Sequence, residues 1–134
     1  MARLSRREAA TLLVLAALAG AAAVALDALG SHALRERLSG KELGWWQTGC
    51  RYLLVHALAG ALAALLAMTH CGRGGAAAAW LLGGAAVFAG TLCAMALGAP
   101  AWLGRLTPLG GGAMILGWVL LAVAGWRAGA EDTA

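Results

Sequence analysis

PLGGGAMILGWVLLAVAGW, residues 108–126, is the stretch that decides the fold, because it contains no Lys, Arg, Asp or Glu. An apolar run of about 20 residues is long enough to cross the hydrocarbon core of a bilayer as a helix. Three further apolar runs precede it, at residues 9–29, 52–69 and 79–97. The sequence therefore predicts an all-α fold, an integral membrane bundle of four transmembrane helices that forms a single domain over residues 1–134.

The composition places the chain in a bilayer rather than in water. Of its 134 residues, 62% are hydrophobic and 12% are charged, which leaves too little polar surface to cover a water-soluble globule. The apolar residues are grouped into blocks, whereas the strands of a membrane β-barrel would alternate apolar and polar residues. The net charge of +4 belongs to short flanks and loops. We therefore expect the lipid bilayer, with its anionic lipids, as a partner, and no nucleic acid.

The segment before the second span carries a helix start of its own. Ser39 to Glu42 has the S-x-x-E form of a capping box, so a helix is expected to begin there. Trp45 and Trp46 follow, and tryptophan favours the headgroup depth of a membrane. The sequence predicts a short interfacial helix that leads into the second span.

The first apolar run has two interpretations. Arginines before an apolar run are also typical of a signal peptide, and Ala23-Val24-Ala25 fits a small-x-small cleavage site. We favour a retained first helix, because the apolar character continues to Leu29 and reaches a length that can span. Cleavage would leave three spans.

The number of basic residues does not decide the orientation. One side of the membrane would receive Arg3, Arg6, Arg7, Arg73 and Arg127, and the other Arg35, Arg37, Lys41, Arg51 and Arg105. Cytoplasmic flanks are rich in Lys and Arg, and the first helix usually dominates the orientation. We expect both termini on the cytoplasmic side, because arginines gather in the leading flank.

Most of the unusual residues are predicted to lie on one side of the membrane, where antiparallel spans bring the first connection and the third together. The candidate ligand or proton site there consists of Asp27, His32, Arg51, Tyr52 and His56. An ionisable group at the depth of Asp27 normally pairs or lines a wet cavity. We favour a structural ion pair with Arg51 or His56. A carboxylate that handles a proton or a ligand, and a side chain that snorkels to water, are the alternatives.

His32 and His56 form the one pair on that side that could bind a metal or haem. Helical metal sites usually provide several ligands at i, i+3 or i+4, and the sequence has no HxxxH, ExxH or CxxC motif. Tyr52 and His56 share a helix face, so a hydrogen-bonded pair is expected. The cysteines are spread singly and are interpreted as packing residues: Cys50, Cys71 and Cys93. We expect structural histidines, no metal and no cofactor, with a small ligand or a proton relay as the alternative.

Small residues on the third span indicate where another helix would pack. Ala86, Gly90, Ala94 and Gly98 follow one another at i+4 intervals. A row of small residues lets a second helix approach closely in a membrane. This row is the predicted packing face, and Gly98 is also expected to break the helix.

The start of the fourth span is a second candidate packing site. Thr107 can cap a helix, and Pro108 suits a first helical turn. Gly110, Gly111 and Gly112 follow, and we expect these glycines to serve tight helix contact. The alternative is that free backbone N–H groups at this helix end bind an anionic headgroup or a carboxylate.

Motifs of hydrolysis and phosphoryl transfer are absent from the sequence. There is no Ser-His-Asp arrangement, no pair of catalytic carboxylates, no P-loop and no dinucleotide fingerprint. We expect a non-catalytic accessory or structural membrane protein of unknown molecular function, with a membrane-protein partner or a homo-oligomer as its assembly. The alternatives are a small transporter or ion pathway, and a haem-, quinone- or lipid-binding component that uses His32 and His56.

Four stretches of the chain resemble a known family. They are ALGSHAL (28–34), RYLLVHAL (51–58), GGAAVFAGTL (83–92) and LTPLGGGAMILGW (106–118). Their order is similar to that of the uncharacterised small membrane proteins numbered 423 among the domains of unknown function, which include bacterial inner-membrane proteins and a eukaryotic transmembrane relative. The resemblance implies four helices in a bacterial inner membrane. It implies no activity and no catalytic residue.

Overall fold

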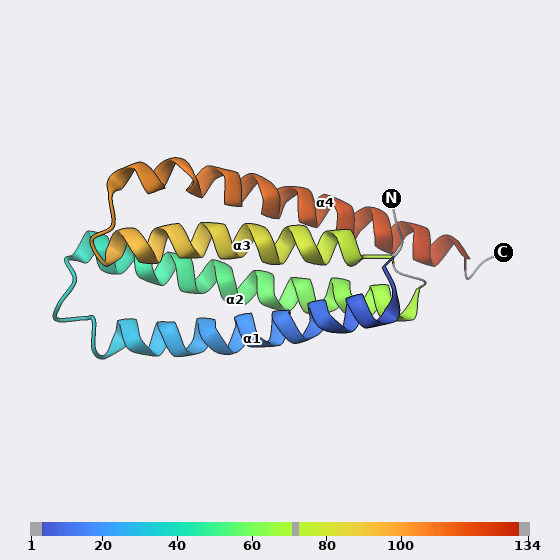
Figure 1. Cartoon of the computed structure of the whole chain (residues 1–134), viewed down its shortest axis with the longest axis horizontal. Helices are drawn as coiled ribbons and strands as arrows, with labels where there is room; N and C mark the ends of the chain where they lie inside the picture. The colour runs from blue at the N-terminus through green and yellow to red at the C-terminus, as the bar shows by residue number, and fades with distance from the viewer. Residues whose placement is uncertain (1–3, 71–72, 132–134) are drawn as a thin grey trace.

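The computed structural model describes residues 4–70 and 73–131, and its elements follow one another along the chain as antiparallel helices (Figure 1). They are α1 (Arg6–Ser31), α2 (Gly40–Thr69), α3 (Gly75–Ala96), the short 3₁₀ helix η1 (Ala101–Arg105) and α4 (Thr107–Glu131). Four of the helical segments are long and apolar enough to cross a membrane. The predicted all-α fold with four spans is confirmed.

A capping box begins α2 at the predicted position. The Ser39 hydroxyl accepts a hydrogen bond from the Glu42 backbone N–H at 3.3 Å, and the Glu42 carboxylate accepts one from the Ser39 backbone N–H at 2.8 Å. Ser5 and Glu8 form the same arrangement at the start of α1. From Gly40 the helix continues unbroken to Thr69. The segment expected as a short interfacial helix is therefore the first part of the helix that contains the second span.

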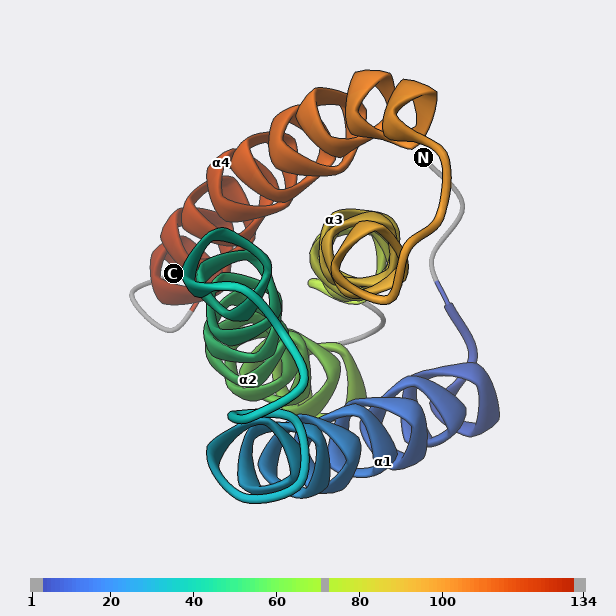
Figure 2. The ribbon, with the colours of Figure 1, turned by 90° about the vertical axis from the view of Figure 1, so that its left-hand side faces the viewer.

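The helices pack mainly with their neighbours in the sequence. α1 packs on α2, α2 on α3 and α3 on α4, whereas α1 and α4 are not in contact within the described residues. Figure 2 shows α1 and α4 at opposite margins of the bundle, with α2 and α3 between them. α2 and α4 approach each other only slightly. The bundle is therefore an open arc of helices and not a closed ring.

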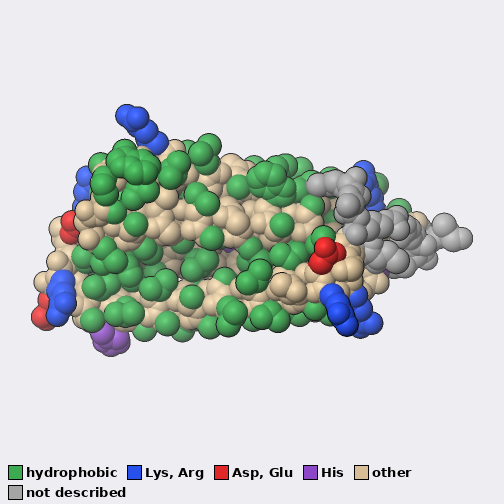
Figure 3. Space-filling model, viewed as in Figure 1, with side chains coloured by type: hydrophobic (Ala, Val, Ile, Leu, Met, Phe, Trp, Pro, Cys, Tyr) green, Lys and Arg blue, Asp and Glu red, His purple; other side chains and the backbone are tan. Residues whose placement is uncertain are grey.

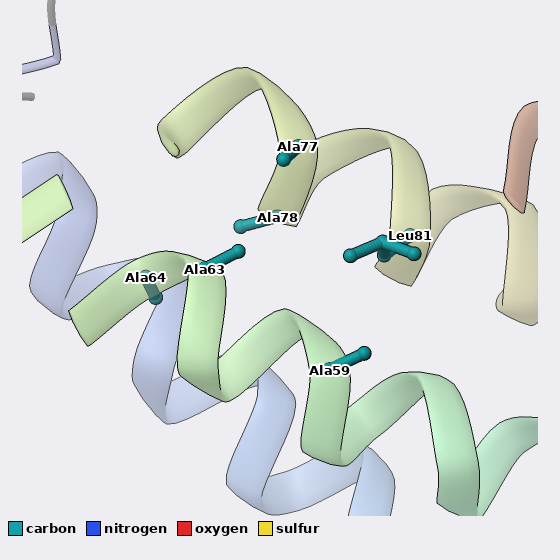
Figure 4. Close-up of a cluster of buried hydrophobic side chains, with 6 residues drawn as sticks. All are labelled: Ala59, Ala63, Ala64, Ala77, Ala78 and Leu81. Atoms are coloured by element: carbon teal, nitrogen blue, oxygen red, sulfur yellow. The ribbon is translucent and has the colours of Figure 1, made fainter. Parts of the chain in front are cut away.

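Alanine makes up most of the interface between α2 and α3. Close to one end of the bundle, a buried cluster combines three alanines of α2 with two alanines and a leucine of α3 (Figure 4): Ala59, Ala63, Ala64, Ala77, Ala78 and Leu81. Many larger apolar side chains point outward instead, and on the face shown in Figure 3 they cover the middle, while Lys, Arg, Asp and Glu gather toward the two ends. This distribution suits a bilayer, where lipid covers the large side chains and small residues let the helices approach closely.

Glycine brings the backbones of α3 and α4 into contact. A Cβ atom placed on Gly84 would lie 2.8 Å from the Gly110 carbonyl oxygen, and one placed on Gly110 would lie 2.7 Å from the Gly84 carbonyl oxygen. On the next turns of the same interface, a Cβ atom on Gly117 would lie 2.7 Å from the Leu81 side chain. These glycines fix the line along which the two helices meet.

The small-residue row predicted for α3 does not form this interface. Ala86 and Gly90 are exposed, and a Cβ atom on Gly90 would have no neighbour within 4 Å. The i+4 spacing of the row was right, but the row lies on another face of α3 than the interface with α4. A helix this rich in alanine and glycine carries small residues on several faces. Gly98 does end the helix as expected: it adopts a φ of 94°, a left-handed conformation that favours glycine.

Trp46 lies inside the bundle, where the sequence suggested contact with lipid headgroups. Its side chain is 4% exposed, and its indole N–H donates to the Leu26 carbonyl oxygen of α1 at 2.7 Å. Gly30 leaves the space for the ring, because a Cβ atom there would lie 2.6 Å from Trp46 Cδ1. Trp45 is partly exposed, with the Lys41 ammonium 4.9 Å from its ring centre. Helix packing therefore explains the position of Trp46.

Candidate functional site

The connection between α1 and α2 and the connection between α3 and α4 lie at one end of the bundle, at the left of Figure 1. We call this end, which comprises residues 32–39 and 97–106, the motif end. Asp27 lies one turn before the end of α1, close to it. His56 lies deeper, because α2 begins at Gly40 and a rise of about 1.5 Å per residue places His56 about 24 Å along the helix. The expectation that His56 lies beside the motif end was therefore wrong, because α2 starts well before its apolar run.

Both ring nitrogens of His56 form hydrogen bonds inside the bundle. Nδ1 lies 2.7 Å from the Tyr52 carbonyl oxygen, and Trp118 Nε1–H donates to Nε2 over 3.2 Å. A carbonyl oxygen only accepts, so Nδ1 carries the proton, and Nε2 then has the lone pair that Trp118 requires. The geometry selects the neutral Nδ1–H tautomer. No ring nitrogen of this buried side chain is left for a ligand.

His56 belongs to a group of aromatic rings that come from three helices. The Tyr52 ring stacks on it with centroids 5.8 Å apart and planes inclined by 9°. Tyr52 also contacts Phe88 of α3 at 4.6 Å, and Trp118 of α4 meets the imidazole edge-on at 6.1 Å. The predicted proximity of Tyr52 and His56 appears as this stack and as the bond to the Tyr52 backbone. We call Tyr52, His56, Phe88 and Trp118 the aromatic cluster.

His32 is not part of the aromatic cluster. It is exposed at the C-terminal cap of α1, where its backbone N–H donates to the Ala28 carbonyl oxygen at 3.1 Å. The structure thus does not bring together the two histidines that were considered as a metal or haem pair. Within residues 4–70 and 73–131, no group of three or more His, Cys, Asp and Glu could hold a metal ion.

A threonine pair joins α3 to the start of α4. Thr91 is 7% exposed, and its hydroxyl donates to the Phe88 carbonyl oxygen at 3.0 Å. Its oxygen lies 2.8 Å from the Thr107 hydroxyl, so Thr107 is the donor of that second bond. Thr107, which was expected to cap α4, therefore uses its side chain to contact α3.

The glycine run that follows Thr107 is only partly used for packing. Gly110 contacts α3, whereas a Cβ atom placed on Gly111 or on Gly112 would have no neighbour within 4 Å. The backbone N–H groups of Leu109 and Gly110 both donate to the Leu106 carbonyl oxygen, and Pro108 has no N–H to offer. These amides are thus not available to an anion at the start of α4.

A cleft of about 430 Å³ lies between α1 and α2 near the motif end, with Asp27 on its α1 wall and Arg51 on its α2 wall. Both residues are exposed and both line the cleft, which also has polar side chains from Ser31 and Gln47. In the described part of the chain no ion pair joins Asp27 to Arg51 or to His56. The favoured prediction of a structural ion pair is therefore wrong, because the two charges stand on opposite helices with the cleft between them.

The cysteines of the described segments are free. Cys50 is buried with Trp46 and Ala96, and Cys93 packs against this group from α3. Their positions agree with the interpretation of cysteine as a packing residue. Cys71 lies outside the described residues.

Four interhelical contacts involve residues that the sequence did not single out as site residues: Trp46, Phe88, Thr91 and Trp118. Spacing within one helix pointed to Tyr52 and His56, but Trp118 lies 62 residues from His56. The sequence marked Trp118 only as the last residue of the stretch 106–118 that resembles the family. No local pattern connects Thr91 with Thr107.

The sequence matches the family described as "Protein of unknown function (DUF423)" over residues 26–111, most of the chain and most of the site just described. The chain belongs to this family. It is similar to the UPF0382 membrane protein YwdK of Bacillus subtilis (strain 168), with 37% identity over 114 residues, 84% of this chain and 93% of the relative. It is also similar to the UPF0382 inner membrane protein YgdD of Escherichia coli (strain K12), with 35% identity over 120 residues, 87% of this chain and 89% of the relative. No solved structure matches the chain.

Membership in the DUF423 family and the four apolar helices agree on the setting of the protein. It is a multi-pass protein of the bacterial inner membrane. The family description and the names of these relatives state no activity.

Proposed function

We propose that the protein is a non-catalytic accessory protein of the inner membrane, which acts by packing against another membrane protein. One observation carries this proposal. Within the described residues, every buried side-chain nitrogen or oxygen has a hydrogen-bond partner. The polar groups inside the bundle hold helices together and leave no free group to bind a substrate or carry a proton.

The aromatic cluster argues against the haem and transport alternatives. A histidine that binds haem iron needs a free imidazole nitrogen. A proton pathway needs a titratable group that can exchange its hydrogen-bond partners. His56, the ionisable residue nearest the middle of the described spans, uses both nitrogens in bonds to Tyr52 and Trp118. Asp27 lies within a turn of the end of α1. His56 therefore lacks a free nitrogen for these functions, and Asp27 lacks a central position in the membrane.

The experiment is native mass spectrometry of the full chain, extracted from its own membrane in a mild detergent. We expect an assembly of defined stoichiometry that contains this chain and one other membrane protein. The same assembly should re-form when the two purified proteins are mixed in lipid nanodiscs. A chain that is extracted without a protein partner contradicts the accessory role, and so does an assembly that does not re-form from the two purified proteins.

A flux measurement separates this role from transport. Proteoliposomes that contain the chain should leak protons and small cations no faster than empty liposomes. The matched variant Asp27→Asn should give the same rate as the wild type. A flux that depends on Asp27 would contradict the proposal and support an ion pathway.

We further propose that both termini are cytoplasmic. α1 begins and α4 ends at the same end of the bundle, opposite the motif end (Figure 1). Arg6 and Arg7 begin α1 on that side, Arg3 precedes them in the sequence, and positive residues before the first helix favour the cytoplasm. A reporter fused after Ala134 that fluoresces only in the cytoplasm should be active. An alkaline phosphatase fusion at the same position should be inactive, and the reverse pattern would refute this orientation.

A further inference from the structure

The cleft between α1 and α2 has a graded lining. α1 runs toward the motif end and α2 runs away from it, so the two helices line the cleft with antiparallel rows of side chains. From the motif end inward, the exposed side chains of the cleft are Ser31, Asp27 and Val24 on α1, and Gln47, Arg51 and Leu54 on α2, while the buried Ala23 and Cys50 complete the lining. Both rows pass from neutral polar, through charged, to apolar. At about 1.5 Å per residue each row is about 10 Å long, of the same order as the interfacial layer of about 5 to 7 Å that borders the hydrocarbon core.

The two charges in the middle of this gradient are opposite in sign and are not paired with each other. Asp27 and Arg51 are exposed to the cleft, and no ion pair joins them in the segments that the structure describes. Charged groups at the edge of a bilayer are costly unless water or a charged partner solvates them. A single molecule that carries a cation and an anion a few bonds apart could pair with Asp27 and Arg51 at the same time.

We propose that this cleft binds a zwitterionic lipid headgroup, with a primary ammonium on Asp27, a phosphodiester on Arg51 and an acyl chain along Val24 and Leu54. A primary ammonium donates hydrogen bonds to a carboxylate, whereas a quaternary ammonium has none to donate. The planar guanidinium of arginine matches a phosphate with two parallel hydrogen bonds. The ligand is therefore an ethanolamine phosphodiester, and the apolar inner end of the cleft favours its membrane form over the free water-soluble ester.

The test is native mass spectrometry of the full-length protein with defined lipids of identical acyl chains. Phosphatidylethanolamine, phosphatidylcholine and phosphatidylglycerol are added at equal concentrations. We expect ethanolamine lipid to be retained at least about tenfold better than the other two, since charge-assisted hydrogen bonds are among the strong ones and about 1.4 kcal/mol corresponds to tenfold. Asp27→Asn should lower its retention to the level of phosphatidylglycerol, and Arg51→Gln should lower the retention of all three lipids.

Arg35→Gln is the matched control, because Arg35 is an exposed cation of the α1–α2 connection that does not line the cleft. It should retain lipid like the wild type. All three variants alter exposed side chains, and equal melting temperatures without added lipid would show that the fold is intact. Retention of ethanolamine lipid that is unchanged in both Asp27→Asn and Arg51→Gln would overturn the site. A loss in Arg51→Gln alone, with phosphatidylglycerol bound as well as phosphatidylethanolamine, would overturn the zwitterionic assignment.

A competition arm distinguishes the two sources of the ligand. Glycerophosphoethanolamine carries the same charged groups without acyl chains. It should displace the lipid only at concentrations far above that of the lipid. Equal affinity for the two would overturn the membrane form of the ligand and assign the free ester to the cleft. None of these outcomes depends on a protein partner. The lipid site and the accessory role can therefore be confirmed or refuted independently of each other.

Discussion

Trp118 of α4 donates its indole N–H to Nε2 of His56 in α2, over a distance of 3.2 Å. These two helices otherwise approach each other only slightly. The bond therefore ties α4 to a helix that is not its main packing partner, and the Tyr52 ring stacks on the same imidazole. This donor thus adds a direct link between α2 and α4 to the glycine contacts that pack α4 on α3.

Replacing Trp118 by phenylalanine removes this donor and keeps an aromatic ring. Nε2 of His56 then becomes a buried acceptor without a partner. Interhelical hydrogen bonds in membranes contribute about 0.6 kcal/mol on average and up to about 1.7 kcal/mol, so we expect Trp118→Phe to destabilise the protein by about 1 kcal/mol. Reversible unfolding in mixed micelles measures this value.

Trp126→Phe is the control for that measurement, because the Trp126 side chain is 83% exposed. It should change the free energy of unfolding by less than about 0.5 kcal/mol. Equal destabilisation by the two substitutions would mean that the bond between Trp118 and His56 does not contribute.

Gly84→Ala should separate α3 from α4. The added Cβ atom would lie 2.8 Å from the Gly110 carbonyl oxygen and 2.8 Å from the Met114 backbone nitrogen, and backbone atoms cannot turn aside as a side chain can. We expect a loss of about 1 to 3 kcal/mol in the free energy of unfolding, typical of an overpacked interface. Gly90→Ala is the matched variant on the same helix, with open space around the new methyl group. It should be neutral or stabilising by up to about 1 kcal/mol, and a larger loss at Gly90 than at Gly84 would reverse the assignment of the two faces.

Gly30 and Trp46 should behave as one unit in a double-mutant cycle. Gly30→Ala displaces the indole and breaks its bond to the Leu26 carbonyl oxygen, whereas Trp46→Phe removes the bond directly. In the Gly30→Ala background the hydrogen bond to Leu26 is already lost, so Trp46→Phe removes less stabilisation. We expect the combined loss of stability to fall short of the sum of the single losses by at least about 0.5 kcal/mol. Additive losses would show that the two residues are not coupled.

Thr91→Val and Thr107→Val test the threonine pair between α3 and α4. Each substitution removes a hydroxyl and keeps nearly the same shape, so the cycle isolates the bond between the two side chains. We expect a coupling energy of about 0.6 kcal/mol, the average for such bonds in membranes. Thr69→Val gives the baseline for losing a hydroxyl that bonds only within its own helix. A coupling energy indistinguishable from zero would refute the interhelical bond.

The parts of the fold that the sequence predicted are those encoded locally. An apolar run long enough to span a bilayer marks a helix wherever it occurs, and Ser39 and Glu42 mark a helix start through bonds across a single turn. Tyr52 and His56 met because four residues return a helix to the same face. Each of these properties lies within one segment of the chain.

The parts that could not be predicted depend on which faces of two helices meet. Small residues recur on several faces of α3, so a row through Gly90 had the same period as the true interface at Gly84. Trp46 is buried because Gly30, on another helix, leaves room for its ring. The expected ion pair between Asp27 and Arg51 depended on the distance between side chains on two different helices, and a sequence does not give that distance.

The open arc of helices has a consequence for biosynthesis. Because contacts run mainly from each helix to the next, every newly inserted segment can dock on the one that entered the membrane immediately before it. α1 and α2 can pair while the ribosome is still translating α3, and no early helix has to wait for a late one to cover its main interface. The exception is His56, whose Nε2 gains its indole partner only when α4 arrives. The hydrogen bond between Trp118 and His56 can thus form only after α4 has entered the membrane.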